Sequence, residues 1–200
     1  MPVENLQELL KHELGDLLFA EKTILKALPK MAREVSNPEM RARMEEHVRE
    51  TEQQVANLQR AFEAMGERAK AETCPAILGL VKEHDDFKKE EEPSKPMLEA
   101  FDLGSGLRIE HYEIAAYRTA IAIAKNLGLR DVVAPLQENL AQELAMAKFI
   151  EQSASAALVA VRANSEADES RAAAKRARGA TKGGAKTATK RASKRATTAA

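Results

Sequence analysis

The chain has 200 residues and is rich in Ala, Leu, Glu, Lys and Arg, with one cysteine and 4% aromatic residues. This composition favours an all-α protein, and a single cysteine excludes an intrachain disulfide and suits a reducing cytosol. The net charge of zero hides a division, because residues 1–170 carry 31 acidic and 21 basic residues, whereas residues 171–200 carry ten basic residues and no acidic one.

We expect a cytoplasmic protein that does not enter a membrane. The sequence shows no signal peptide and no apolar run that we read as long enough to span a bilayer. The helices expected below are amphipathic, which is typical of a bundle with one hydrophobic interior.

The first predicted helix covers residues 4–34. Its apolar stripe has a carboxylate, Glu21, at its centre, whereas Asp16 lies off the stripe and is expected in water. Pro29 lies inside the pattern and predicts a kink or an early end. The stripe consists of Leu14, Leu17, Leu18, Ile24, Leu25 and Leu28.

The second predicted helix covers residues 38–65, with Asn37 as its N-cap and a proline at its first position. His47 borders the apolar stripe of this helix, and Glu50 lies one step further out. These two residues are three apart and are therefore neighbours on the helix surface. The stripe consists of Met40, Met44, Val48, Thr51, Val55, Leu58, Phe62 and Met65, with Gln54 at its border.

Residues 67–96 are polar and form the connection to the next pair of helices, with a short helix expected over 75–92. The third long helix begins near residue 97 and ends before Gly128, which readily adopts the left-handed conformation of a helix C-cap. Glu110 and Glu113 fall on or beside its apolar face. That face consists of Leu107, Ile114, Tyr117, Ile121 and Ala124.

The fourth long helix is expected over 129–162, with Glu143 at the centre of a stripe of apolar residues. From residue 166 the chain contains no large apolar side chain, so it cannot bury enough surface to offset the entropy of ordering. We therefore predict a helical domain over 1–165 and a disordered basic tail over 166–200. The stripe of the fourth helix consists of Leu136, Leu140, Ala147 and Ile150.

Four helices thus direct ionisable groups toward one interior, where an unpaired carboxylate is costly unless it is protonated, paired or bound to a cation. Glu21 and Glu50 are 29 residues apart and Glu113 and Glu143 are 30 apart, so two hairpins of matched length bring them to one level. Oxygen ligands with one imidazole suit iron or manganese. The predicted dinuclear metal site consists of Glu21, His47, Glu50, Glu110, Glu113 and Glu143.

Some of these residues also have an explanation without a metal. Glu50 and Glu113 could lie at the core edge with their carboxylates in water, and His47 could be a core-edge histidine bonded to a carbonyl. The carboxylates at the centres of three separate stripes are harder to explain by chance. Tyr117 could be a core tyrosine or could donate a hydrogen bond to a ligand, and His111 points away from the stripe.

Four segments carry a family resemblance that spans residues 3–155. They are AEKTILKALPKMAREVSNPE at 20–39, EHVRETEQQV at 46–55, EHYEIAAY at 110–117 and the region of Gln142 and Glu143. Together they resemble the YciE/YciF stress-protein family of the ferritin-like superfamily. The resemblance implies a ferritin-like, often dimeric helical bundle that binds metal and is associated with stress.

The chain departs from the general ferritin pattern in one respect. That pattern has Glu-x-x-His on the second and fourth helices. Here the residue three positions after Glu50 is Gln53, and the residue three positions after Glu143 is Met146. We therefore expect an all-α, ferritin-like four-helix bundle with a short extra helix in the crossover, a disordered basic C-terminal tail and its own ligand set.

Two functions remain open at this stage. The first is a metal-binding stress-response protein whose iron or manganese reacts with peroxide or oxygen, with Glu21, Glu110 and Glu143 as core ligands. The alternative is a non-enzymatic, DNA-associated or scaffolding bundle that acts through its tail. A homodimer is expected from the resemblance and from the apolar surface left on the Ala-rich fourth helix.

The tail itself predicts binding of DNA without sequence preference, which would place the protein at the nucleoid. The ten basic residues of 171–200 can neutralise phosphates, but no aromatic residue is present to stack on bases. A flexible solubilising tail, or one that folds back on the acidic bundle, would explain the same charges.

Overall fold

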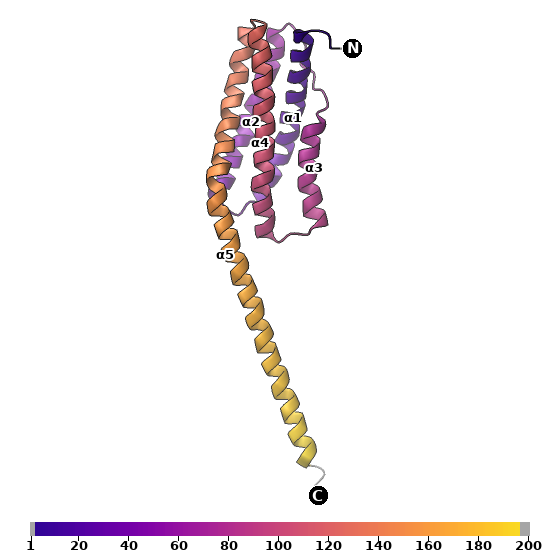
Figure 1. The fold of residues 1–200 in the computed structure, drawn as a ribbon, viewed down its shortest axis with the longest axis vertical. Helices are drawn as coiled ribbons and strands as arrows, with labels where there is room; N and C mark the ends of the chain where they lie inside the picture. Colours follow the sequence, from indigo (N-terminus) through magenta and orange to yellow (C-terminus); the bar gives the residue numbers. More distant parts are fainter. Residues whose placement is uncertain (1–2, 197–200) are drawn as a thin grey trace. The chain divides into compact units, whose positions relative to one another are not determined.

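The computed structural model describes residues 3–196, which form five α-helices and contain no β-strand (Figure 1). The prediction of an all-α protein is confirmed. The helices are α1 (Leu6–Glu34), α2 (Pro38–Ala64), α3 (Pro75–Glu90), α4 (Lys95–Asn126) and α5 (Arg130–Ala196). Helix α1 packs against α2, α3 and α4, and α3 also packs against α4.

Local sequence signals explain several helix ends. The side chain of Asn37 accepts hydrogen bonds from the N–H groups of Glu39 (2.9 Å) and Met40 (3.1 Å), so it caps α2 as predicted. Gly128, after α4, has a φ of +74°, and Gly66, after α2, has a φ of +70°. Both are in the left-handed region that glycine adopts without steric cost, and each lets the chain leave its helix.

Helix α1 continues through Pro29 and ends at Glu34, the predicted end; of the two effects expected of Pro29, a kink or an early end, the early end is wrong. A proline inside a helix costs about 3 kcal/mol. Leu28 and Ala32, on either side of the proline, are buried in the core. Burial of a leucine side chain contributes about 1.5–3 kcal/mol, so tertiary packing offsets most of the local penalty.

Helix α5 extends to Ala196, beyond the end near residue 162 that the sequence predicts. The predicted disorder from residue 166 is therefore not confirmed, and residues 197–200 lie outside the described residues. Ala, Lys and Arg favour a helix even where they cannot form a core. Contacts divide the chain into two compact units, Met1–Ser155 and Ala156–Ala200.

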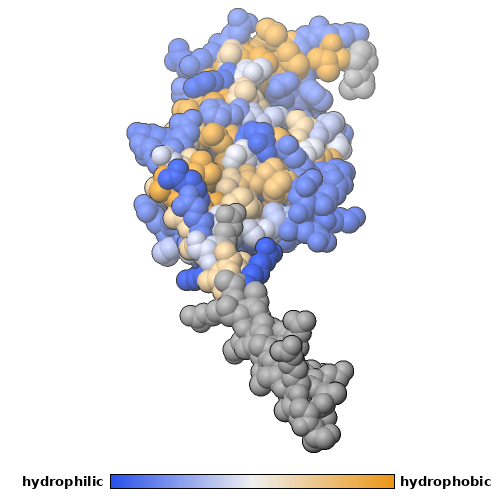
Figure 2. All heavy atoms as spheres, turned by 60° about the horizontal axis from the view of Figure 1, so that its bottom comes forward, coloured by the Kyte–Doolittle hydropathy of each residue, from blue (hydrophilic) through white to orange (hydrophobic). Residues whose placement is uncertain are grey.

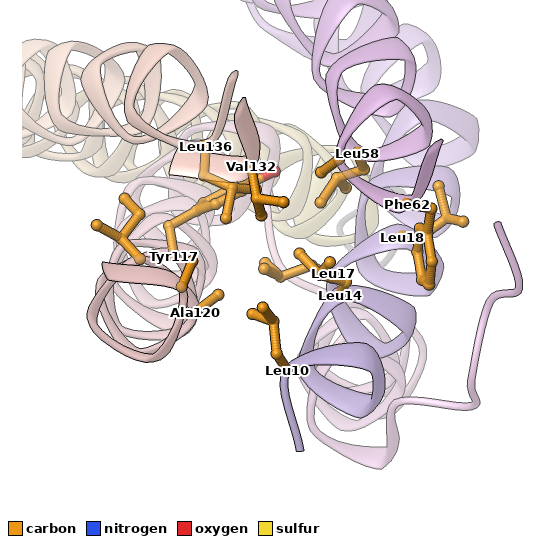
Figure 3. Packing of buried hydrophobic residues seen from close by; sticks show 13 residues of the cluster. Leu10, Leu14, Leu17, Leu18, Leu58, Phe62, Tyr117, Ala120, Val132 and Leu136 are labelled. Atoms are coloured by element: carbon orange, nitrogen blue, oxygen red, sulfur yellow. The ribbon is translucent and has the colours of Figure 1, made fainter. Parts of the chain in front are cut away.

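The interior of the first unit contains two apolar clusters. The first joins α1, α2, α4 and the start of α5 (Figure 3), and the second joins α1, α2, α4 and α5 with the start of α3. On α2, α4 and α5 the predicted ligand positions lie between residues of the two clusters, and on α1 Glu21 lies at the start of the second cluster. The first includes Leu14, Leu18, Leu58, Phe62, Tyr117 and Leu136, and the second includes Ile24, Met44, Ile77, Ile109, Met146 and Ile150.

The segment between α2 and α3 crosses α1 at Gly15. The N–H of Glu72 donates to the carbonyl oxygen of Gly15 at 2.9 Å. A Cβ atom at position 15 would lie 2.8 Å from Cγ of Glu72 and 3.0 Å from the carbonyl oxygen of Lys70. Close approach of the two backbones therefore requires glycine at this position.

One stretch among the described residues, Arg130–Arg176 in α5, is long and apolar enough to cross a membrane by length and composition alone. By this criterion the expectation of no such stretch is wrong. The same stretch contributes Leu136, Ile150 and the fully buried Glu143 to the bundle interior. Only 17% of the qualifying window is buried, and length and composition in one helix are weak evidence, so this stretch carries no argument for a membrane.

Candidate metal centre

Five of the six predicted ligands lie close together at the level between the two apolar clusters. The possible ligand atoms of His47, Glu110 and Glu143 all lie within 4.8 Å of one another. Those of Glu21, Glu113 and Glu143 form a second group with the same spacing. Glu143 belongs to both groups, so the two potential sites are adjacent and share one carboxylate.

These side chains lie in the interior because each occupies the face of its helix that carries the apolar stripe. Glu21 on α1, His47 on α2, Glu113 on α4 and Glu143 on α5 are at most 1% exposed, and Glu110 is 4% exposed. The alternative that Glu113 lies at the core edge in water is therefore wrong. His47 contacts carboxylates, with Nε2 at 3.5 Å from Oε1 of Glu110 and 3.8 Å from Oε2 of Glu143.

Glu50 lies in neither group. Its side chain is 21% exposed, and its Oε2 atom accepts hydrogen bonds from Arg43 (2.8 Å) and from Nδ1 of His47 (2.9 Å). A neutral imidazole that donates Nδ1–H to a carboxylate has a free lone pair on Nε2, which is the usual arrangement of a metal-binding histidine, so His47 would have to lose its second proton to bind a cation. The geometry makes Glu50 a positioning group for His47, whose Nε2 faces the other carboxylates.

A second layer of polar side chains holds the buried carboxylates in place. The Tyr117 hydroxyl donates to Oε1 of Glu21, and the Gln54 amide donates to Oε1 of Glu143. Asn139 donates to the Tyr117 oxygen at 2.9 Å, and Asn57 donates to Asn139 at 2.6 Å. Tyr117 thus fits both explanations, because it is buried in the first apolar cluster and also donates to Glu21, one of the predicted ligands.

The sequence reasoning did not assign these amides, although a signal for them exists. Gln54 and Asn57 follow the buried His47 by seven and ten residues, and Asn139 precedes Glu143 by four, so all lie on the inward faces of their helices. Polar residues at helical spacing from an inward ligand candidate would have identified this layer.

Three of the buried carboxyl groups, those of Glu21, Glu113 and Glu143, have pKa values that favour the protonated form. Burial raises the pKa of Glu21 to about 8, although the Tyr117 hydrogen bond and His47 act in the opposite direction. Burial and then the neighbouring carboxylates also raise the pKa values of Glu113 and Glu143 well above the ordinary range. Burial lowers the pKa of His47, but its carboxylate partners, Glu110 and Glu50, outweigh this effect and raise it to about 9.

The residues present fit a pair of divalent cations. Three buried carboxylate oxygens, Oε2 of Glu110, Oε1 of Glu113 and Oε2 of Glu143, have no hydrogen-bond partner among the described residues. A buried carboxylate oxygen without a partner is costly, and a cation is one way to satisfy it. The four carboxylates of the two groups carry four negative charges when ionised, which two divalent cations would balance.

Other polar groups lie outside this centre. The Tyr112 hydroxyl donates to Asp16 and lies 2.9 Å from Sγ of Cys74, so the prediction that Asp16 is only solvated is wrong. His84, which gave no signal in the sequence, is buried with Nε2 at 3.1 Å from a carboxylate oxygen of Asp102. A pocket of about 360 Å³ on α3 and α4, lined in part by the ring of Phe101, shares no residue with the centre.

The fold and the site together define an all-α bundle whose interior holds a histidine–carboxylate cluster that could bind metal ions. Residues 5–164 match the family described as "Domain of unknown function (DUF892)", and the chain belongs to this family. The resemblance to the YciE/YciF family is confirmed by a relative, Protein YciF of Escherichia coli (strain K12). The two are 30% identical over 146 residues, which cover 72% of this chain and 87% of YciF.

Solved structures with the same fold include two related proteins. YcfI from Rhodopseudomonas palustris superimposes with a TM-score of 0.72 at 37% identity, covering 74% of this chain and 94% of its own. The E. coli stress protein YciF superimposes with a TM-score of 0.71 at 27% identity, covering 78% and 98%. The family match ends at residue 164, so residues 165–200 lie outside it.

Proposed function

We propose that the protein is a ferritin-like metal-binding protein with a dinuclear iron or manganese centre in its bundle. One observation carries the proposal: five buried ligand groups from four helices converge in two adjacent groups that share Glu143. The unpaired oxygens of three of these carboxylates support it, since a buried carboxylate oxygen without a partner is costly and a cation would satisfy it.

Each residue of the centre has a defined part in this proposal. Glu21, Glu110, Glu113, Glu143 and His47 would hold the two ions. The second layer orients them, with Tyr117 on Glu21, Gln54 on Glu143 and Glu50 on His47. The two apolar clusters exclude water on both sides. When bound, iron or manganese would supply one-electron redox chemistry with peroxide or oxygen.

We extend the proposal to a role in the stress response. One structural relative is named as a stress protein. A centre that consumes peroxide, or that removes reactive iron from solution, suits such a role. The substrate is tested by adding peroxide or oxygen to the iron-loaded protein and following the iron absorbance.

The metal centre is tested by replacing one shared ligand with an uncharged residue of the same shape. We expect two iron or manganese ions per wild-type chain after anaerobic reconstitution and at least tenfold weaker binding by Glu143→Gln. Glu138→Gln is the matched control, because Glu138 lies on the same helix with a side chain that is 53% exposed. Unchanged metal content in Glu143→Gln, or less than one ion per wild-type chain, would contradict the proposal.

We also propose that the protein forms a homodimer. Large apolar side chains on α5 are exposed, with Leu144 at 40%, Leu158 at 50% and Val159 at 59%. Figure 2 shows hydrophobic side chains between hydrophilic ones on the face in view. Light scattering at micromolar concentration should give the mass of two chains, and a monomer mass would exclude a stable dimer.

A further inference from the structure

The C-terminal part of α5 combines a helical backbone with a regular spacing of basic residues. Seven of them follow one another at intervals of three or four residues, so successive members are neighbours on a helix. At 3.6 residues per turn, the seven positions fall within one half of the helix circumference. This basic stripe consists of Arg171, Lys175, Arg178, Lys182, Lys186, Lys190 and Lys194.

We infer that the basic stripe binds the phosphate backbone of duplex DNA and does not read its base sequence. This inference is independent of the metal centre. Residues 171–196 contain only Ala, Lys, Arg, Gly, Thr and Ser. They therefore lack carboxylates that would repel phosphates, and they lack the amide and aromatic side chains that commonly contact or stack on bases.

The dimensions of the segment match a short piece of duplex. The 26 residues from 171 to 196 are helical, and at 1.5 Å per residue they span about 39 Å, or roughly 11 base pairs. Like charges four residues apart destabilise an isolated helix by a few tenths of a kcal/mol per pair. Phosphates would remove this repulsion, so binding and helix formation favour each other.

Charge complementarity also allows two other partners, and the sequence favours DNA over both. Residues 1–170 carry ten more acidic than basic residues, so the stripe could pair with the acidic bundle of the same or a second chain. An anionic membrane would attract the same charges, but residues 171–196 contain no large apolar side chain to insert into lipid. A duplex presents a denser and more regular array of charge than a protein surface does.

The test measures binding of the full-length chain to two fluorescent 24-base-pair duplexes of unrelated sequence by anisotropy. We expect equal affinities for the two, and a loss of about 1,000-fold between 50 and 200 mM salt if six phosphates are contacted. Changing all seven stripe residues to Gln should abolish binding, with circular dichroism confirming that the helix remains.

Two matched variants test whether one face of the helix is responsible. Arg171→Gln/Arg178→Gln removes two arginines from the stripe, and Arg191→Gln/Arg195→Gln removes two from the opposite half of the helix. The first pair should lower the slope of log affinity against log salt by about 1.8, which corresponds to two lost phosphate contacts. The second pair should leave the slope unchanged.

Several results would overturn the inference. Equal effects of the two pairs would refute the role of one face. Unchanged DNA binding in the variant with seven glutamines would exclude the stripe as the binding surface. No binding at 50 mM salt would indicate that the acidic bundle occupies it. Tighter binding to phosphatidylserine vesicles than to DNA would identify a membrane surface as the partner.

Discussion

The replacement Glu21→Gln separates the effect of this buried carboxylate on folding stability from its proposed role in metal binding. In the native protein the pKa of Glu21 is about 8, against an ordinary value of 4.5. A carboxyl whose pKa is higher in the folded than in the unfolded state destabilises the folded state as pH rises above the unfolded value. Each pH unit in this window costs about 1.4 kcal/mol.

Between pH 4.5 and pH 7 this cost reaches about 3 kcal/mol at most, because the native carboxyl stays protonated while the unfolded one ionises. Glutamine keeps the size of the side chain and an oxygen that can accept from Tyr117. Metal-free Glu21→Gln should therefore be as stable as the wild type at pH 4.5 and up to about 3 kcal/mol more stable at pH 7.

Guanidinium unfolding of chelator-treated protein at four pH values between 4.5 and 7 measures this difference. Glu13→Gln, on the same helix but outside the centre, is the control and should show no comparable trend. A difference between Glu21→Gln and wild type that stays constant with pH would refute the reasoning. With iron or manganese present the order should reverse, since the variant lacks a ligand.

Two further replacements test the packing of the crossover and the orientation of the histidine. Gly15→Ala should destabilise the protein by about 1–3 kcal/mol, because the new Cβ would lie 2.8 Å from Glu72. Gly79→Ala, where a Cβ meets nothing within 4 Å, should instead stabilise α3 by up to about 1 kcal/mol in thermal melts. Glu50→Gln should weaken metal binding by about 10–100-fold in titrations while leaving the number of ions unchanged, and a lost ion would make Glu50 a ligand.

Helical periodicity was sufficient to predict most of the centre. Glu21 and Glu143 lie in the middle of apolar stripes, so they face the interior even if the helix is rotated slightly about its axis. Glu50 and Glu113 both lie near the edge of a stripe, and one is 21% exposed whereas the other is buried. Spacing on one helix cannot separate these cases, because a small rotation against the neighbouring helices decides which edge is covered.

Two other features depended on information that the local pattern does not contain. His84 belongs to a short helix with a weak apolar edge, but this helix packs against α4, and His84 is buried with Nε2 at 3.1 Å from Asp102. Composition predicts disorder after residue 166 because it measures whether a segment can form a core. It does not measure whether an Ala-, Lys- and Arg-rich segment can form a helix, and α5 continues to Ala196.

The division of the centre between two hairpins has a consequence for assembly. Helices α1 and α2 contribute Glu21 and His47, whereas α4 and α5 contribute Glu110, Glu113 and Glu143. The chain passes between the hairpins once, through the crossover that contains α3. If the chain were cut between α3 and α4, neither fragment would contain a complete site. Each fragment would carry carboxylates without a positive charge to neutralise them. The two fragments would then reassociate only when a cation binds to ligands from both of them. The divided bundle would report the presence of the cation by the association of its two halves.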